Sequence, residues 1–428
     1  MIWSVAGGLL ALLALSIPVG VVLFLLGFGV DLFFSPFPLI RGLGQVVWSA
    51  SDSSLLIAIP FFVLLGEILV RAGIAERTYK ALDSWLSWLP GGLIHANIGT
   101  ATMFSATSGS SVATAATVAT VAMPQAERLG YDPRLFSGAI AAGGTLGIMI
   151  PPSINLIVYG FLTETSIPRL FLAGLLPGLL LALGFMIITA AICKLRPSLG
   201  GAGRDFAWSQ RLSGLAELLP ILLLFAVVIG SIYRGWATPT EAAALGVAMA
   251  GLIAAWHRAL TRAMLVEALL GTMRITAMIM LVIVAAYFLN YTLASAGLGR
   301  ELRGFLDGLG LDATGTLIAI VLLYLVLGFF VETLSLMVAT IPIVVPIVAG
   351  LGFDKVWFGI LLILLIEMAL ITPPVGLNLY VVQGARKGGS LAEVMLGAAP
   401  YVLTMLLMAL LLILFPGLAL WLPASAGG

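Results

Sequence analysis

The sequence alternates long apolar runs with short polar segments, a pattern that predicts a series of membrane-spanning helices. The runs expected to span the membrane are residues 5–30, 38–50, 55–70, 135–163, 170–193, 212–232, 239–256, 274–292, 356–382 and 394–421. Two further apolar stretches, residues 95–124 and 314–346, have glycine and hydroxylated residues near their centres. Each is expected to form two short helices that meet at a tip inside the membrane, a re-entrant hairpin.

A duplicated unit underlies this pattern. Residues 104–160 and 330–384 follow the same plan, with matched positions 222 residues apart. The matches are Pro124 with Pro346, Leu129 with Leu351, Gly130 with Gly352, Asp132 with Asp354, Phe136 with Phe358, and Pro151-Pro152 with Pro373-Pro374. The likeness extends upstream, where Ala72-Gly73 and Leu82-Asp83 recur as Ala296-Gly297 and Leu306-Asp307. The chain therefore contains two copies of one unit.

Each copy combines a Pro-Pro step within an apolar run and a partner segment that bears hydroxyl groups. Proline removes a helical hydrogen bond, and broken helix at membrane depth is tolerated only where it is buried in protein or lines a polar cavity. Paired interruptions in two halves are typical of the midplane binding site of a transporter. The alternative, that proline and glycine only kink two packed helices, is disfavoured because both halves are interrupted at matching positions.

The composition agrees with a polytopic membrane protein. The 428 residues are 61% hydrophobic and 9% charged, whereas a soluble domain carries about 25% charged residues. A single cysteine, Cys193, excludes a disulfide framework or a cysteine metal cluster, and two distant histidines, His95 and His257, do not suggest a metal site. The net charge of +1 gives no reason to expect nucleic-acid binding. No A-x-A cleavage pattern follows the first apolar run, so we expect that run to be retained.

The charged residues predict an orientation. Residues 71–89 mix charge with Leu and Trp at helical spacing, which predicts an amphipathic helix at the membrane surface. Counting crossings places the N-terminus outside, in agreement with the positive-inside rule. The segments then expected in the cytoplasm, which hold most of the Lys and Arg residues, are those around Arg41 and residues 71–88, 127–134, 194–211, 257–274 and 386–387. In this topology the two hairpins enter from opposite sides, so the repeats are inverted.

Four ordered motifs resemble a known family. They are SGSSVATAATVATVAMP (residues 108–124), LGYDPRLFSGAIAAGGTLGIMIPPSINLIVYG (129–160), ATPTEAAALG (237–246) and LITPPVGLNLYVVQGA (370–385). Together they look like the large membrane subunit of TRAP (tripartite ATP-independent periplasmic) transporters, and the likeness covers nearly the whole chain. Two departures are visible: Thr114 and Glu332 stand where the family often has Asp.

The resemblance implies a Na⁺-coupled importer of organic anions, mostly carboxylates and acid sugars, in the bacterial inner membrane. It also implies two partners, a small four-helix membrane subunit and a periplasmic substrate-binding protein. The fold implied is an all-α, inverted-repeat, elevator-type transporter with two re-entrant helical hairpins and two broken transmembrane helices. Its expected parts are scaffold helices (1–70 and 212–295), interfacial arm helices (71–93 and 296–310), a transport domain (94–193 and 311–424) and a cytoplasmic linker (194–211).

Candidate ion ligands lie at the hairpin tips and the helix breaks, where backbone carbonyls and hydroxyls offer the hard oxygen ligands that Na⁺ prefers. For a first Na⁺ site we select Ser108, Gly109, Ser110, Thr145, Gly147 and Pro151. For a second we select Gly328, Glu332, Thr333, Ala369, Thr372 and Gly376. The simpler alternative for each hydroxyl is a hydrogen bond to its own helix backbone or a role in packing.

Candidate substrate contacts lie beside these sites. Asn155 and Asn378 follow the two Pro-Pro steps, and Ser111 and Ser335 follow the two tips; helix amide ends there would face an anionic group. Glu367, within an apolar run, has no assigned role. We expect Glu67 to extend toward the cytoplasmic surface, and Glu241 either to cap a helix or to act in function.

The sequence also bears on two other classes of protein. A stand-alone sodium/anion (di- or tricarboxylate) symporter of the same superfamily would share the hairpins and the Pro-Pro breaks. An enzyme or a nucleotide-driven pump is not expected, because the sequence has neither an HExxH motif nor a GxxxxGK[ST] loop. The sequence does not name the anion.

Overall fold

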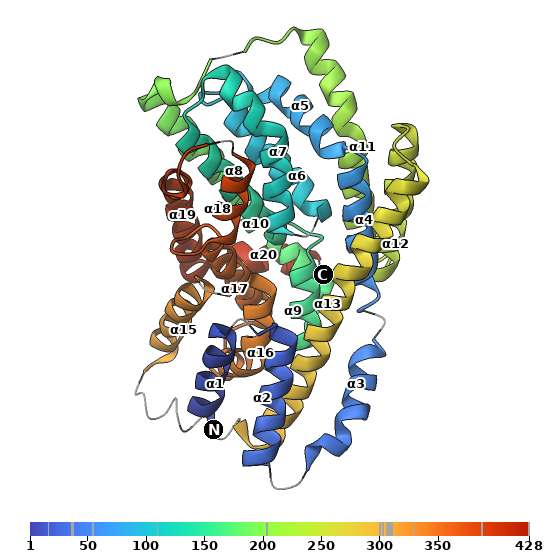
Figure 1. Ribbon diagram of the computed structural model, residues 1–428, viewed down its shortest axis with the longest axis vertical. Helices are drawn as coiled ribbons and strands as arrows, with labels where there is room; N and C mark the ends of the chain where they lie inside the picture. The colour runs from blue at the N-terminus through green and yellow to red at the C-terminus, as the bar shows by residue number, and fades with distance from the viewer. Residues whose placement is uncertain are drawn as a thin grey trace.

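The computed structural model describes residues 1–15, 17–35, 38–53, 55–108, 110–202, 204–298, 301, 304, 311–329, 331–386 and 388–426. Within these ranges the regular secondary structure is helical (Figure 1). Six helices are long and apolar enough to cross a membrane, or up to eight if each of two bent helix pairs counts as one span. The chain is therefore a multi-pass, all-α protein. Most of the predicted second arm helix, 296–310, lies outside the described residues.

The helices of the first half are α1 (Ile2–Ala14), α2 (Val19–Phe34), α3 (Leu43–Ser51), α4 (Ala58–Arg71), α5 (Ile74–Leu86), α6 (Leu93–Ser108), α7 (Ser111–Leu129), α8 (Pro133–Met149), α9 (Ile154–Thr163) and α10 (Ile167–Leu195). Short 3-10 turns, η1 (Leu39–Gly42) and η2 (Pro197–Leu199), precede α3 and follow α10. The helices of the second half are α11 (Trp208–Tyr233), α12 (Pro239–Trp256), α13 (Arg262–Ser295), α15 (Ala313–Gly328), α16 (Thr333–Gly350), α17 (Lys355–Ala369), α18 (Leu377–Ala385), α19 (Leu391–Leu414) and α20 (Gly417–Ala426).

The repeated Leu-Gly-aromatic-Asp motif starts the same structure in both halves. Gly130 and Gly352 have positive φ angles of 68° and 88° just after α7 and α16. The carboxylate of Asp132 accepts hydrogen bonds from the first-turn amides of α8, and the carboxylate of Asp354 does the same for α17. Local chemistry therefore ends one helix and begins the next at equivalent positions of the two copies.

Both Pro-Pro steps interrupt helices, as predicted. Helix α8 ends at Met149 and α9 begins at Ile154, while α17 ends at Ala369 and α18 begins at Leu377. Helices α8 and α9 are bent by 41° at their break. Both Pro-Pro peptide bonds are cis. Glu241 also has a local role, since its carboxylate and the Thr238 hydroxyl form a capping box at the start of α12.

Three predicted spans are wrong in detail. Residues 5–30 form two helices, α1 and α2, because Pro18 supplies no amide hydrogen and restricts the residue before it. Residues 38–50 form only η1 and α3, whose 9 residues are too short to cross a bilayer. Residues 394–421 are divided between α19 and α20, with Pro416 directly before α20.

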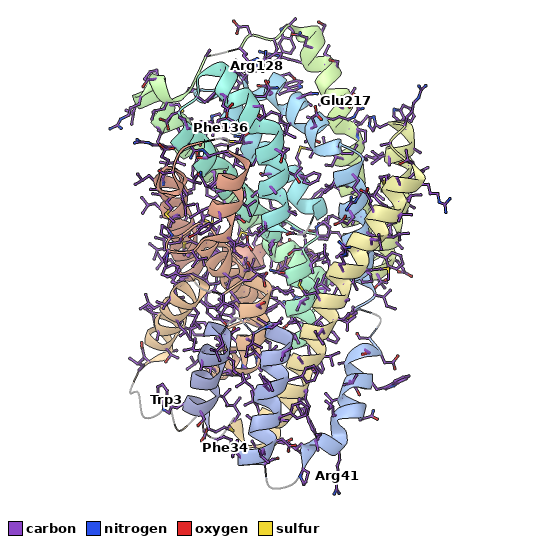
Figure 2. The ribbon with its side chains drawn as sticks, viewed as in Figure 1. Trp3, Phe34, Arg41, Arg128, Phe136 and Glu217 are labelled. Atoms are coloured by element: carbon purple, nitrogen blue, oxygen red, sulfur yellow. The ribbon has the colours of Figure 1, made fainter. Side chains whose placement is uncertain are left out.

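The topology also needs a correction at Arg41. Figure 2 shows Arg41 at the same end of the molecule as Phe34 and Trp3, and Arg128 at the opposite end, the end that also holds Glu217. The predicted topology put Arg41 and Arg128 on one side. The extra turn between α1 and α2 returns the chain to the end where it began, so Arg41 shares the end of the N-terminus.

Helices α8 and α17 form the centre of the molecule. Every residue from Leu135 to Met149 in α8, and from Val356 to Ala369 in α17, is buried. Each hairpin, α6–α7 or α15–α16, packs on the central helix of its own half. The second piece of each broken helix crosses to the other half: α18 packs against α7, and α9 against α16. Helices α4, α12 and α13 pack together at the side, with α2 against α13.

Candidate functional site

A cavity of about 200 Å³ lies where the two hairpin tips face helices α4 and α13. Its wall on the hairpin side includes the starts of three helices, α7, α9 and α16, together with Ile148 near the end of α8 and Leu370 just after α17. The lining residues at the three helix starts are Ser110, Ser111, Val112, Ala113, Ile154, Asn155, Glu332, Thr333 and Leu334. The opposite wall comes from Val63, Gly66, Glu67 and Val70 of α4 and from Ile275, Met278 and Ile279 of α13.

Each of the three helix starts is capped by a side chain. The Ser110 hydroxyl accepts a hydrogen bond from the Ala113 amide at the start of α7. The Ser153 hydroxyl accepts one from the Leu156 amide at the start of α9. Glu332 accepts from two amides at the start of α16, one to each carboxylate oxygen. The N-terminal end of a helix carries a partial positive charge that stabilises an anion. At α16 the Glu332 carboxylate already offsets this charge, whereas the starts of α7 and α9 are capped by neutral hydroxyls and still favour an anion in the cavity.

Of the four predicted substrate residues, two line this cavity. Asn155 and Ser111 are 4% and 2% exposed, and the side-chain nitrogen of Asn155 has no partner among the described residues. Asn378 is fully buried outside the cavity lining, and its side-chain nitrogen donates to the Ala141 carbonyl. Ser335 is not among the lining residues either, and its amide is bound by the Glu332 cap.

The predicted first ion site is only partly assembled. Ser110 lines the cavity at the tip, whereas the Thr145 hydroxyl donates to the Ala142 carbonyl and faces Met405 of α19. Gly147 and Pro151 are buried near the end of α8. Ser108 ends α6, but its side chain and Gly109 lie outside the described part of the chain.

The residues of the predicted second ion site fall into two groups. Glu332 and Thr333 line the cavity. Gly328 and Ala369 contact each other so closely that a Cβ at Gly328 would lie 2.4 Å from the Ala369 Cβ. The two remaining residues lie at the second break: the Thr372 hydroxyl donates to the Met368 carbonyl, and Gly376, with φ 57°, precedes α18.

Sequence reasoning missed a buried contact between the two halves. The hydroxyl of Ser111, the first residue of α7, donates to the carboxylate of Glu367 on α17. Glu367 is only 1% exposed. Its position inside an apolar run marked it as unusual, but no local pattern could name a partner 256 residues away.

Glu67, which we expect to extend toward the cytoplasmic surface, has a further position in the structure. Glu67 lines the cavity, and its side chain is 20% exposed. It forms an ion pair with Arg71 at 2.9 Å, and Arg71 also pairs with Glu267 of α13 at 2.6 Å. The Glu67–Arg71 pair could have been predicted from the sequence, because residues four apart on a helix lie on the same face. Through these two ion pairs the Arg71 guanidinium joins α4 to α13, the two helices that form this wall of the cavity.

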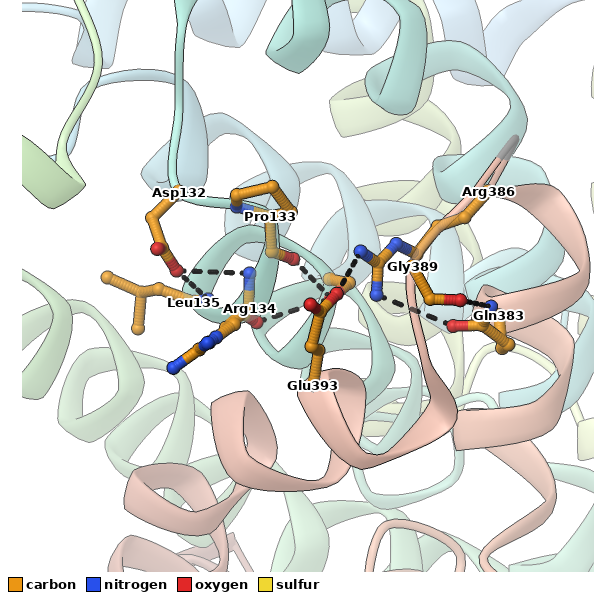
Figure 3. A network of polar contacts seen from close by, with 9 residues as sticks. Asp132, Pro133, Arg134, Leu135, Gln383, Arg386, Gly389 and Glu393 are labelled. Atoms are coloured by element: carbon orange, nitrogen blue, oxygen red, sulfur yellow. Dashed lines mark hydrogen bonds and ion pairs between the residues drawn. The ribbon is translucent and has the colours of Figure 1, made fainter.

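A polar network fastens the end of the second broken helix (Figure 3). Arg386, just after α18, binds Glu393 of α19 at 2.6 Å and also donates to Gln383. Gln383 in turn donates to the Gly389 carbonyl. The Arg386 guanidinium lowers the pKa of the Glu393 carboxyl, chiefly through this hydrogen bond. The network therefore closes the loop between α18 and α19 beside the capped start of α8.

The comparisons with known proteins agree with this architecture. A family model described as "Tripartite ATP-independent periplasmic transporter, DctM component" matches residues 6–418. The chain is 33% identical over 397 residues to the C4-dicarboxylate TRAP transporter large permease protein DctM of Pseudomonas aeruginosa, covering 92% of each chain. It is also 33% identical to the sialic acid TRAP transporter large permease protein SiaM of Vibrio cholerae, covering 89% of this chain and 88% of that one.

A solved structure supports the fold alone. Neisseria gonorrhoeae MtrF, a member of a class of antimetabolite efflux pumps, superposes with a TM-score of 0.64 at 13% identity, covering 93% of each chain. The family match extends over almost the whole sequence and the relatives are transport proteins rather than enzymes. This chain belongs to the DctM family, the large permease subunits of TRAP transporters.

Proposed function

We propose that this permease imports an organic anion, a carboxylate or an acid sugar, across the bacterial inner membrane, and that an inward Na⁺ gradient drives the import. The single observation that carries the proposal is the convergence of the hydroxyl-capped N-termini of α7 and α9 on one cavity. Such ends stabilise a carboxylate through backbone amides without requiring a basic residue. The names of two relatives point the same way, since C4-dicarboxylates and sialic acid are both anions.

Sodium coupling rests on the chemistry of the tips. Na⁺ bound beside Ser110, Glu332 and Thr333 would add positive charge next to the anion, so that each ligand favours binding of the other. The six candidate ligands chosen at each tip and break remain our proposed ion sites, with Asn155 as the strongest substrate contact. Thr145 is the weakest ligand candidate, because its hydroxyl already has a backbone acceptor.

An elevator movement would follow from where the cavity lies. One wall belongs to the hairpins and broken helices (94–193 and 311–424), and the other belongs to α4 and α13 in the scaffold segments 1–70 and 212–295. Sliding the first set past the second would carry the bound anion across the membrane. Helix α5, bent by 66° from α4, would act as an arm between the two parts. A small membrane subunit and a periplasmic binding protein would complete the tripartite system that the family description names.

The test is uptake into proteoliposomes that contain this permease with its cognate small subunit. The binding protein is first screened by thermal shift with C4-dicarboxylates, sialic acid and other organic acids, and the best ligand is used in labelled form. We expect uptake to require both the loaded binding protein and an inward Na⁺ gradient. Uptake driven by a proton gradient without Na⁺ would refute sodium coupling. Uptake without the binding protein would instead favour a stand-alone sodium/anion symporter.

The sliding movement needs its own test. Cysteines replacing Met278 of α13 and Leu334 of α16 stand on opposite walls of the cavity, and the native Cys193 is buried. Joining the pair with a bifunctional thiol reagent should stop uptake, and the same variant without reagent serves as the control. Full uptake by the joined protein would contradict an elevator movement.

A further inference from the structure

Glu367 has a buried carboxylate, and one of its two oxygens accepts no hydrogen bond from the described residues. It lies in the last turn of α17, where it is 1% exposed. One carboxylate oxygen, Oε2, accepts the Ser111 hydroxyl, but Oε1 has no hydrogen-bond partner within the described ranges. Among the ion pairs of those residues, none involves Glu367. A charged carboxylate so placed is costly unless a cation neutralises it.

A second buried oxygen without a hydrogen-bond partner among the described residues belongs to Asn378, at the start of α18. Asn378 is fully buried, and its Oδ1 also lacks a partner in the described part of the chain. Its backbone amide donates to the Leu370 carbonyl, which anchors it one turn beyond Glu367. A Cβ at Gly144 would lie 2.8 Å from the Ser111 carbonyl oxygen and 3.0 Å from Asn378 Nδ2. Gly144 therefore marks the point where Ser111 and Asn378 approach each other.

These contacts bring Glu367 and Asn378, two residues of the second half with oxygens that accept no hydrogen bond from the described residues, close to Ser111 of the first half. The first hairpin supplies the Ser111 carbonyl and hydroxyl oxygens, and the second broken helix supplies Glu367 Oε1 and Asn378 Oδ1. Carboxylate, amide carbonyl, backbone carbonyl and hydroxyl oxygens are the donor set of hard cations. With one carboxylate, a monovalent cation would make the site neutral, whereas a divalent cation would leave it charged in a buried environment.

We propose that Glu367, Ser111 and Asn378 form a Na⁺ site in the core between the two halves, with ligands that differ from those of the two sites proposed above. Occupancy would tie the start of α7 to the end of α17 and the start of α18, and so hold the first hairpin against the second broken helix. This site rests on the proposed sodium coupling and adds one ion to it. Ser111 then acts chiefly in ion binding, and its contact with the cavity is a route by which the ion influences the anion.

The test compares Glu367→Gln with the wild-type protein, using Glu76→Gln as the matched control on an exposed side chain. Gln retains an acceptor for Ser111 but removes the charge. The purified permease is measured for equilibrium ²²Na⁺ binding and for its thermal midpoint in NaCl against choline chloride at constant ionic strength. We expect Glu367→Gln to bind one Na⁺ fewer than wild type and to gain less stability from NaCl, while Glu76→Gln matches wild type.

Ser111→Ala is a second variant in case Glu367→Gln does not fold. This variant leaves the Glu367 carboxylate in place but removes one hydroxyl ligand. It should weaken the Na⁺ affinity of the proposed core site about tenfold. If Glu367→Gln or Ser111→Ala binds Na⁺ with wild-type stoichiometry and affinity, the core site is wrong while sodium coupling stands. If wild type itself binds no Na⁺, the proposed sodium coupling fails and this site fails with it.

Discussion

Gly138 of α8 and Gly397 of α19 bring two helix backbones into direct contact. A Cβ at Gly138 would lie 2.0 Å from the Gly397 carbonyl carbon, and one at Gly397 would lie 1.8 Å from the Arg134 carbonyl oxygen. Neither neighbour is the flexible end of a side chain, so no local rotation could make room. The last transmembrane helix can approach the central helix this closely only because both residues lack a side chain.

Replacing either glycine with alanine should therefore destabilise the permease. For Gly397→Ala or Gly138→Ala we expect a loss of about 1–3 kcal/mol, because the helices must move apart to admit the methyl group. The thermal midpoint of the purified protein is the measurement. Gly251→Ala in α12 is the matched control, since a Cβ there has nothing within 4 Å, and it should be neutral or stabilising. Equal midpoints for all variants would contradict the close contact.

Removing a repeated cap should weaken both halves equally. Asp132→Ala and Asp354→Ala each delete a carboxylate that accepts two amide hydrogen bonds at a helix start. We expect each to cost about 1 kcal/mol of stability. The corresponding Asn variants retain an oxygen acceptor and should lose less. Thermal unfolding checks the order, and an Asp→Asn loss as large as the Asp→Ala loss would show that charge, and not capping, matters.

A negative charge in the cavity should oppose an anionic substrate. Asn155→Asp adds a carboxylate at the start of α9, where the cavity has neither the Arg71 that pairs with Glu67 nor the amides that bind Glu332. Repulsion should raise the KM for uptake about tenfold. Asn155→Ser, which remains neutral and polar, serves as the control and should have a smaller effect. Initial rates in proteoliposomes give both values. An unchanged KM for Asn155→Asp would exclude this cavity as the anion site.

The Arg386–Glu393 pair predicts a dependence of stability on pH. Arg386 lowers the pKa of Glu393 in the folded chain. The pair therefore contributes stability above the pKa of the unfolded carboxyl, and the contribution is lost as the pH falls through the lower folded value. Glu393→Gln should be less stable than wild type near pH 7, and the difference should vanish below about pH 4. Midpoints measured from pH 7 to pH 3 test this, and a difference that persists in acid would point to a packing effect.

Much of the fold could be predicted because its signals are local. Proline and glycine act on their own backbone, so the breaks at Pro151-Pro152 and Pro373-Pro374 appear where the sequence places them. The caps of Asp132 and Asp354 are equally local. The predicted single span over residues 5–30 is wrong for the same local reason, because Pro18 divides this apolar run into α1 and α2.

The candidate site was less predictable because its contacts join distant parts of the chain. The amino-acid sequence by itself determined the membrane class, the duplication and the positions of the helix breaks, since these depend on composition and on short spacings. Only the tertiary structure decided that Ser111 meets Glu367, that Glu67 lines the cavity and that Asn378 lies outside it. Helix packing sets those distances, and it depends on side-chain shape summed over many turns rather than on any local pattern.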